Sequence, residues 1–190
     1  GNDLMNGDDG SDYIEGGVGG TNNPVDTING GAGNDILFGD NGHSFGVTNN
    51  TNMGAGNGTN PVGGREGDPD YAYNSYGEYD TEEGDNDVIS GGDGDDQAYG
   101  QGGNDLMSGG EGNDLLFGDA GNDVMAGNNG DDQLDGGEGN DYMEGNDGQD
   151  ELDGDAGEDT IRGGAGNDFV QGGADNDDIG GGTGEDFLNG

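Results

Sequence analysis

Carboxylates recur along this chain at a fixed spacing, and that spacing is what could do chemistry. In the stretch GGEGNDLLFGDAGNDVMAG, residues 109–127, an aspartate returns after nine residues, as does the glycine that opens each unit. A period of nine is neither that of a helix nor that of a strand, so it belongs to a larger structural unit. Carboxylate and carbonyl oxygens are the ligands that Ca²⁺ prefers, and Mg²⁺ suits such a flexible set less well. The pattern therefore indicates a series of calcium sites.

Eleven such units follow one another without a gap from residue 91 to residue 189. Glycine fills position one and aspartate position six in all eleven, and position four is glycine except at Asp175. Position eight is apolar in every unit: Ala98, Met107, Leu116, Met125, Leu134, Met143, Leu152, Ile161, Val170, Ile179 and Leu188. Upstream the frame continues, with extra residues in 16–29 and a long insertion in 39–90. Because the sequence starts and stops inside repeats, we expect it to be a segment of a longer protein.

The nonapeptide divides into a turn and a strand. Glycine at positions one, two and four allows the positive φ values of a tight turn, which aims its carbonyl oxygens at one point. The aspartate that closes the turn adds a carboxylate. The next three residues point outward, inward and outward, as in a short strand that buries position eight. Two units then form one coil of eighteen residues, and stacked coils would hold Ca²⁺ between turns, for example between Asp105 and Asp123.

The composition excludes several partners. Forty-four acidic residues face two basic ones, Arg65 and Arg162, for a formal net charge of −42. Nucleic acid and anionic membranes are bound through Lys and Arg, so neither is an expected partner. The charge also opposes a compact fold unless cations are bound, so we expect an expanded chain without metal and a rod with it. Cysteine is absent, which excludes disulfides, and no apolar stretch is long enough to cross a bilayer.

Residues that could form a catalytic set are missing. His43 is the only histidine, and no serine–histidine–acid set or zinc quartet can be built around it. The glycine-rich turns lack the lysine of a phosphate-binding loop. We therefore expect no enzymatic activity from this chain.

The pattern GGxGxDxUx resembles the repeat of the RTX (repeats-in-toxin) calcium-binding family over nearly the whole chain, the main insertion excepted. The resemblance implies an all-β fold, a right-handed parallel β-roll (a β-solenoid) of 18-residue coils with Ca²⁺ between stacked turns. It also implies bacterial type I secretion and folding on meeting extracellular calcium. On matching positions it implies these ligands: Asp3, Asp12, Asp26, Asp35, Asp87, Asp96, Asp105, Asp114, Asp123, Asp132, Asp141, Asp150, Asp159, Asp168, Asp177 and Asp186. Sixteen units in two stacks give 16 − 2 = 14 intervals, so about 10–14 ions are expected.

The chain divides into N-terminal repeats (1–42, with a short insertion at 20–25), a loop insertion rich in tyrosine and acids (43–84) and regular repeats (85–190). The expected function is that of a calcium-binding structural or adhesive segment of a larger secreted or cell-surface bacterial protein. One alternative is the secretion and folding domain of an exported protease or lipase whose catalytic domain lies outside these residues. Another is a self-assembling surface-layer or fibre unit.

Positions seven and nine face outward, and several are apolar. We expect a column of Val88, Leu106, Val124 and Tyr142 on one sheet, and of Phe38, Tyr99 and Phe117 on the other. Contiguous apolar patches usually mark interfaces, so we expect these columns to be covered. The cover would be the tyrosine-rich insertion, a second copy of the chain or another surface protein. The two insertions lie in units two apart and should leave the roll on the same side.

Overall fold

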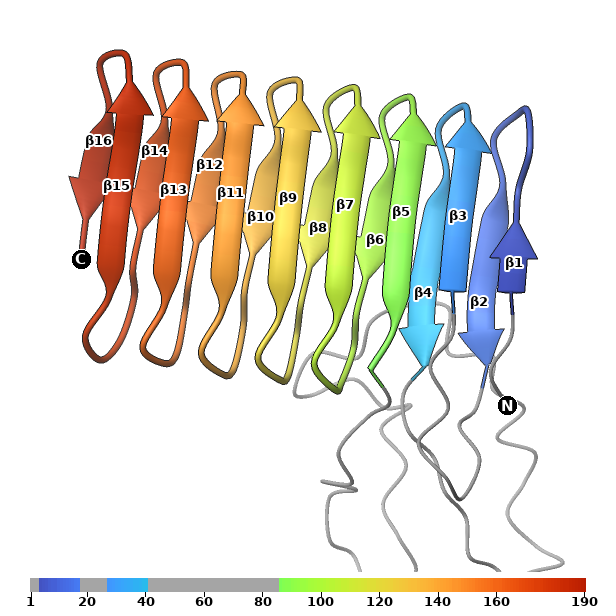
Figure 1. Cartoon of the computed structure of the whole chain (residues 1–190), viewed down its shortest axis with the longest axis horizontal. Helices are drawn as coiled ribbons and strands as arrows, with labels where there is room; N and C mark the ends of the chain where they lie inside the picture. Colours follow the sequence, from blue (N-terminus) through green and yellow to red (C-terminus); the bar gives the residue numbers. More distant parts are fainter. Residues whose placement is uncertain (1–3, 18–26, 41–85) are drawn as a thin grey trace, which may run out of the picture.

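The computed structural model describes residues 4–17, 27–40 and 86–190, and every regular element in these ranges is a β-strand. The chain passes back and forth between two sheets, so that each coil contributes one strand to each (Figure 1). The first sheet contains, in spatial order, β1 (Leu4–Asn6), β3 (Thr27–Ala32), β5 (Val88–Asp93), β7 (Leu106–Glu111), β9 (Val124–Asn129), β11 (Tyr142–Asp147), β13 (Thr160–Ala165) and β15 (Asp178–Thr183). The second contains β2 (Tyr13–Gly17), β4 (Ile36–Asp40), β6 (Gln97–Tyr99), β8 (Leu115–Phe117), β10 (Gln133–Asp135), β12 (Glu151–Asp153), β14 (Phe169–Gln171) and β16 (Phe187–Asn189).

All neighbouring strands run parallel, and the register follows the repeat. Leu106 lies opposite Val124 in the first sheet, and Leu115 lies opposite Gln133 in the second, an offset of two nonapeptides in each case. The predicted parallel β-solenoid of 18-residue coils is therefore confirmed. The described residues contain no helix of the length and apolar character needed to cross a membrane.

The insertions do not disturb this register. Thr27 pairs with Val88 across the longer one, just as Val88 pairs with Leu106 one regular coil later. β2 and β4 are parallel neighbours, with Gly17 opposite Asp40. Both inserted segments therefore start beyond the carboxyl ends of neighbouring strands, on the same side of the roll, as predicted. The inserted residues themselves, 20–25 and 43–84, lie outside the described residues.

Strand length differs between the two sheets. From β6 on, strands of the second sheet have the three residues that the repeat predicts, whereas from β3 on those of the first sheet have six. The extra residues are the first three of the following turn, of which the second and third stay paired with the next coil, for example Gly92 with Gly110. In the other turns only position three makes such a bridge, as between Gly102 and Ala120. The prediction of three-residue strands was therefore wrong for the first sheet.

The core is a single row of side chains between the sheets. Its fully buried members all occupy position eight: Ile28, Leu37, Ile89, Ala98, Met107, Leu116, Met125, Leu134, Met143, Leu152, Ile161 and Val170. Ile179 is partly buried against them. Leu188 is 45% exposed, because β16 is the last strand of its sheet and only β14 lies beside it. The predicted core is thus confirmed except at Leu188.

Candidate metal sites in the turns

The turns that join the sheets stack into two rows, one along each edge of the roll (Figure 1). We call edge A the row that follows first-sheet strands, at the top of the figure, and edge B the row that follows second-sheet strands. The position-six aspartates of edge A are Asp12, Asp35, Asp96, Asp114, Asp132, Asp150, Asp168 and Asp186. Those of edge B are Asp87, Asp105, Asp123, Asp141, Asp159 and Asp177. Two further candidate ligands, Asp3 and Asp26, lie outside the described residues.

Each position-six carboxylate reaches back to the preceding coil. The backbone N–H of Asp105 donates to Oδ1 of Asp123, 2.7 Å away, and the same bond repeats along both edges. It persists across the long insertion, where the N–H of Asp35 donates to Oδ1 of Asp96 at 2.6 Å. The fold therefore brings the described candidate ligands together in two continuous rows, one carboxylate per coil.

The carboxylates of these rows are buried. Eleven of them are at most 2% exposed: Asp35, Asp87, Asp96, Asp105, Asp114, Asp123, Asp132, Asp141, Asp150, Asp159 and Asp168. Oδ1 receives the backbone bond, but among the described residues Oδ2 of Asp105, Asp123 and Asp141 has no hydrogen-bond partner, as in most of the row. A buried, unpartnered carboxylate oxygen is strongly unfavourable unless a cation or a proton neutralises it.

In most turns Oδ2 lies beside a carbonyl oxygen, in a space that only glycine leaves open. A Cβ on Gly118 would be 2.4 Å from Oδ2 of Asp123 and 2.5 Å from the carbonyl oxygen of Gly136. On edge A, a Cβ on Gly91 would be 2.3 Å from Oδ2 of Asp96. Position one is therefore glycine because a side chain would fill the space where carboxylate and carbonyl oxygens converge. These oxygens fit Ca²⁺.

The turn also requires a residue with positive φ at position four. Gly112, at position four, has φ 129°, and a Cβ there would be 1.9 Å from the carbonyl oxygen of Gly94 in the preceding coil. Asp175 is the one departure from glycine at this position in the regular repeats, and it keeps the left-handed backbone with φ 82°. Asp tolerates this region better than most residues, so the turn survives the substitution.

Burial shifts the titration of these carboxylates. It raises the pKa of Asp105 to about 9; the N–H of Asp87 opposes the rise, and the carboxylate of Asp123 adds to it. For the same first cause the pKa of Asp123 rises to about 7 and that of Asp141 to about 6. Without a cation, the rows therefore hold negative charge only with difficulty.

Side chains alone do not complete a metal site. In the part of the chain that the structure describes, no three histidine or acidic side chains gather closely enough to hold an ion. An ion between two turns thus requires backbone carbonyls in addition to carboxylates, the mixture that the repeat indicated.

Sequence reasoning missed a second ladder in the same turns. The side chain at position five accepts a hydrogen bond from the following coil: the N–H of Asn122 donates to Oδ1 of Asn104 at 2.8 Å, and that of Asn140 to Oδ1 of Asn122 at 2.7 Å. This ladder points forward along the roll, whereas the aspartate ladder points backward. Asn or Asp fills position five in eight of the eleven regular units, and this recurrence was the available signal.

Stacked parallel coils with a row of buried carboxylates along each edge define a metal-binding β-solenoid. The family model for the RTX calcium-binding nonapeptide repeat matches residues 1–20, 25–45, 83–116, 117–152 and 153–188. The chain belongs to this family, whose repeats bind calcium. A comparison with curated proteins finds no match.

Proposed function

We propose that this chain is a calcium-binding structural or adhesive β-roll segment of a larger secreted or cell-surface protein, and that it folds when its turns bind extracellular Ca²⁺. The observation that carries the proposal is the pair of buried carboxylate rows, in which, among the described residues, most Oδ2 atoms lack a hydrogen-bond partner and lie beside a carbonyl oxygen. Membership of a calcium-binding family supports the choice of ion. A structural role, without catalysis, is part of the same proposal.

The proposed ligands are the position-six aspartates from Asp3 to Asp186 together with carbonyls of the stacked turns. About 10–14 ions are expected, because each ion joins two turns of one row. About 13 ions would lower the formal charge from −42 to about −16, which relieves the repulsion between coils. Native mass spectrometry in calcium counts them, and fewer than seven would contradict this ligand set.

Folding is tested by circular dichroism. In chelator at about pH 9 the chain should lack the β signal, because charged rows must otherwise be buried without a cation. Millimolar calcium should restore it, and magnesium should do so less well because it demands octahedral geometry. The same β signal in chelator as in calcium would overturn the coupling of folding to calcium.

A secreted or cell-surface bacterial location is proposed because RTX repeats are generally found in secreted bacterial proteins and because calcium is abundant outside cells. The alternatives are the secretion domain of an exported enzyme and a self-assembling surface-layer or fibre unit. A protease or lipase motif elsewhere in the full-length protein would favour the first, and filaments seen by electron microscopy in calcium would favour the second.

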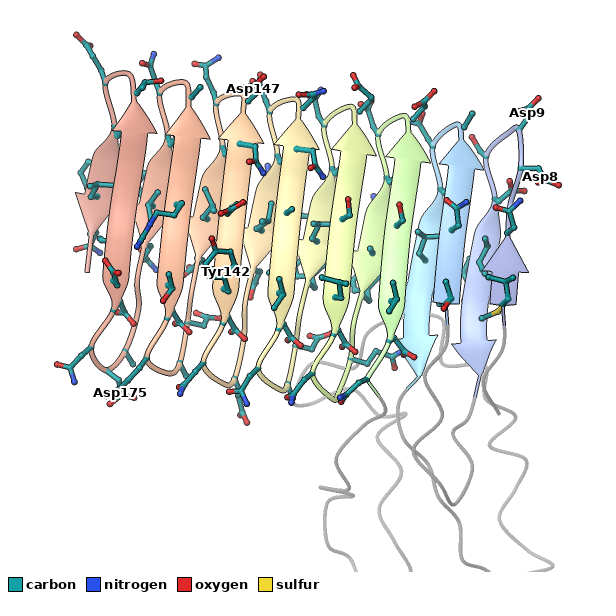
Figure 2. The ribbon with its side chains drawn as sticks, in the orientation of Figure 1. Asp8, Asp9, Tyr142, Asp147 and Asp175 are labelled. Carbon is teal, nitrogen blue, oxygen red and sulfur yellow. The ribbon has the colours of Figure 1, made fainter. Side chains whose placement is uncertain are left out.

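The outer face of the first sheet is the proposed contact surface for a second copy or another surface protein. Leu106, Val124 and Tyr142 are 51%, 43% and 40% exposed on adjacent strands, so the column is exposed in the part of the chain that the structure describes, and Figure 2 shows Tyr142 on this face. On the second sheet Phe38 is only 3% exposed, and its ring packs between those of Tyr13 and Tyr99. Contact is therefore assigned to the first sheet.

Serine at Leu106 and Val124 tests this surface. Both side chains lie on the outer face, so the variant should keep calcium-induced folding and lose association in analytical ultracentrifugation. Association unchanged by the two substitutions would contradict the assignment.

A further inference from the structure

We infer that the position-five side chains decide which coils stay paired when calcium is scarce. The roll would then open first at one place, which we call the seam, between the turns of residues 145–159 and the stacked turns of residues 163–177. The inference rests on the proposed calcium binding. It concerns residues that are not themselves proposed ligands. We call the hydrogen bond accepted by a position-five side chain a rung.

Rungs are regular in the first part of the repeat array. On edge B, Asn86, Asn104, Asn122 and Asn140 each accept the N–H of position five in the next coil, at 2.7–2.9 Å. On edge A, Asp95, Asn113 and Asp131 do the same at 2.8–2.9 Å. Each rung ties two successive turns without any metal.

Two consecutive rungs are missing further along. Gln149 and Glu158 occupy position five, and within the described residues neither accepts a bond from Asn167 or Asn176. Their side chains are one methylene longer than Asn or Asp, which displaces the oxygen and adds rotamer entropy. The rung returns where Asn167 accepts the N–H of Glu185 at 2.8 Å.

One other interval lacks its rung. Asn34 accepts no bond from Asp95 within the described residues, although it is an asparagine. This interval carries the long insertion, so its coil is not a regular one. The seam proposed here concerns the regular array, where side-chain length is the difference.

Several hydrogen bonds of the turns are longer from the same interval on. From Asp87 to Asp159 the position-six bonds measure 2.7–2.9 Å. The bond from Asp150 to Asp168 and that from Asp159 to Asp177 both measure 3.1 Å, as does the next bond, to Asp186. The turn contact between Gly157 N–H and the carbonyl of Ala174 is 3.3 Å, against 2.8 Å one coil earlier. The position-six bonds and this one turn contact are thus longer at the seam, whereas other backbone bonds across it keep their usual length, such as that from Phe169 N–H to the carbonyl of Asp150 at 2.8 Å.

The coils beyond the seam are tied to each other. Arg162 on β13 donates to the carbonyl oxygen and to the carboxylate of Asp178 on β15, at 2.7 and 2.8 Å. Its side chain makes no such bond to the strand before it, β11, in the described structure. Residues 160–189 should therefore separate as a unit when the ions that hold the seam are withdrawn, while residues 86–140 keep their rungs.

The test adds the missing rungs. In Gln149→Asn with Glu158→Asn, position five matches the earlier coils. The matched control, Gln133→Asn with Glu151→Asn, makes the same two chemical changes at exposed position-seven sites on β10 and β12. Hydrogen exchange is followed by mass spectrometry on the whole chain across a calcium series.

In the unsubstituted chain, protection of residues 160–189 should require more calcium than that of residues 86–140. The double variant should lower the calcium midpoint of 160–189 by about twofold, since two neutral hydrogen bonds are gained and several ions share the transition. The control should not. A second variant, Asn113→Gln with Asn122→Gln, should create a new early opening between the turns around 113–122 and those around 131–140.

The outcomes separate this inference from the proposal beneath it. If protection from hydrogen exchange did not depend on calcium, the proposed function would be contradicted. Hydrogen exchange in urea would then still compare the unsubstituted chain with the variant that carries the added rungs. Calcium-dependent protection with equal midpoints in variant and control would overturn the seam alone. If the opening of residues 160–189 were only fraying of the last coils, the added rungs would leave the calcium midpoint of these residues unchanged. That result would also overturn the seam.

Discussion

The roll buries two kinds of row to the same depth, and they differ in what satisfies them. Leu116 in the core and Asp123 at the edge are both almost fully buried. Apolar contacts satisfy the leucine side chain, whereas among the described residues Oδ2 of the aspartate has no hydrogen-bond partner. The apolar row therefore selects the shape of the coil, and the carboxylate rows make that shape conditional on positive charge. Under the proposed function, separate positions of one nonapeptide thus encode the fold and its dependence on calcium.

Protons should replace calcium in closing the carboxylate rows, and this is the largest effect expected. Burial raises the pKa of Asp105 from its ordinary 3.8 to about 9 and that of Asp114 to about 7. A raised folded-state pKa stabilises the fold fully below the unfolded value, and the contribution is lost as pH rises through the folded value. In chelator, the β signal in circular dichroism should therefore be strong near pH 4 and lost by about pH 9.

Calcium should remove this pH dependence above about pH 6, because the ion favours the ionised carboxylates. Acid should in turn weaken calcium binding. A calcium-free chain with more β structure at pH 8 than at pH 4 would show that the buried carboxylates do not control folding.

A cavity in the apolar row should destabilise the roll whether calcium or protons neutralise the carboxylates at its edges. Leu116→Ala removes a fully buried side chain and should lower the free energy of unfolding by about 2–5 kcal/mol, both in calcium and at acid pH without it. Leu115→Ala, one residue away on the outer face of β8, is the control and should cost less than about 1 kcal/mol. Equal losses in urea denaturation would mean that position eight does not form the main core.

These two rows were also the most predictable from sequence, because a residue repeated every nine positions must be stacked in any solenoid. The position-five ladder was not foreseen, since Asn and Asp are ordinary turn residues and their acceptor role depends on the spacing between coils. The ring of Phe38 is buried between the rings of Tyr13 and Tyr99, which come from the coils on either side of it. A local sequence pattern does not reveal such neighbours. Strand length in the first sheet likewise depends on pairing within the turn, not on propensity.

Replacing one buried aspartate by asparagine should separate the effect of the side chain's shape from the effect of its charge. Asp123→Asn keeps the shape and the Oδ1 acceptor but removes a buried charge. Calcium should then bind the adjoining interval about tenfold less tightly, because a charged ligand is lost. Without calcium, the same variant should keep its β signal to slightly higher pH than the parent, because one buried carboxylate no longer ionises. Calorimetry and a pH titration followed by circular dichroism measure the two effects, and a variant weaker in both would contradict the assigned role.

Two glycines at position four separate backbone strain from crowding. Gly10 and Gly112 have nearly the same φ, 127° and 129°, but a Cβ on Gly10 would meet nothing within 4 Å, whereas one on Gly112 would collide with a carbonyl oxygen. Gly10→Ala should cost about 1 kcal/mol from φ alone. Gly112→Ala should cost about 2–3 kcal/mol, since overpacking adds to the strain. Similar costs in urea at saturating calcium would show that stacked carbonyls do not require glycine.

The smallest effect is expected at Asp175, which tests whether an irregular turn weakens its carboxylate row. Its side chain is exposed at edge B, where Figure 2 shows it, and its φ of 82° is one that glycine adopts freely. Asp175→Gly should therefore change the free energy of unfolding in calcium by less than about 1 kcal/mol, in the stabilising direction. Asp175→Ala removes the same charge but resists positive φ, so it should destabilise by about 1 kcal/mol. If alanine were as stable as glycine, charge at this edge, rather than backbone conformation, would decide the strength of the turn.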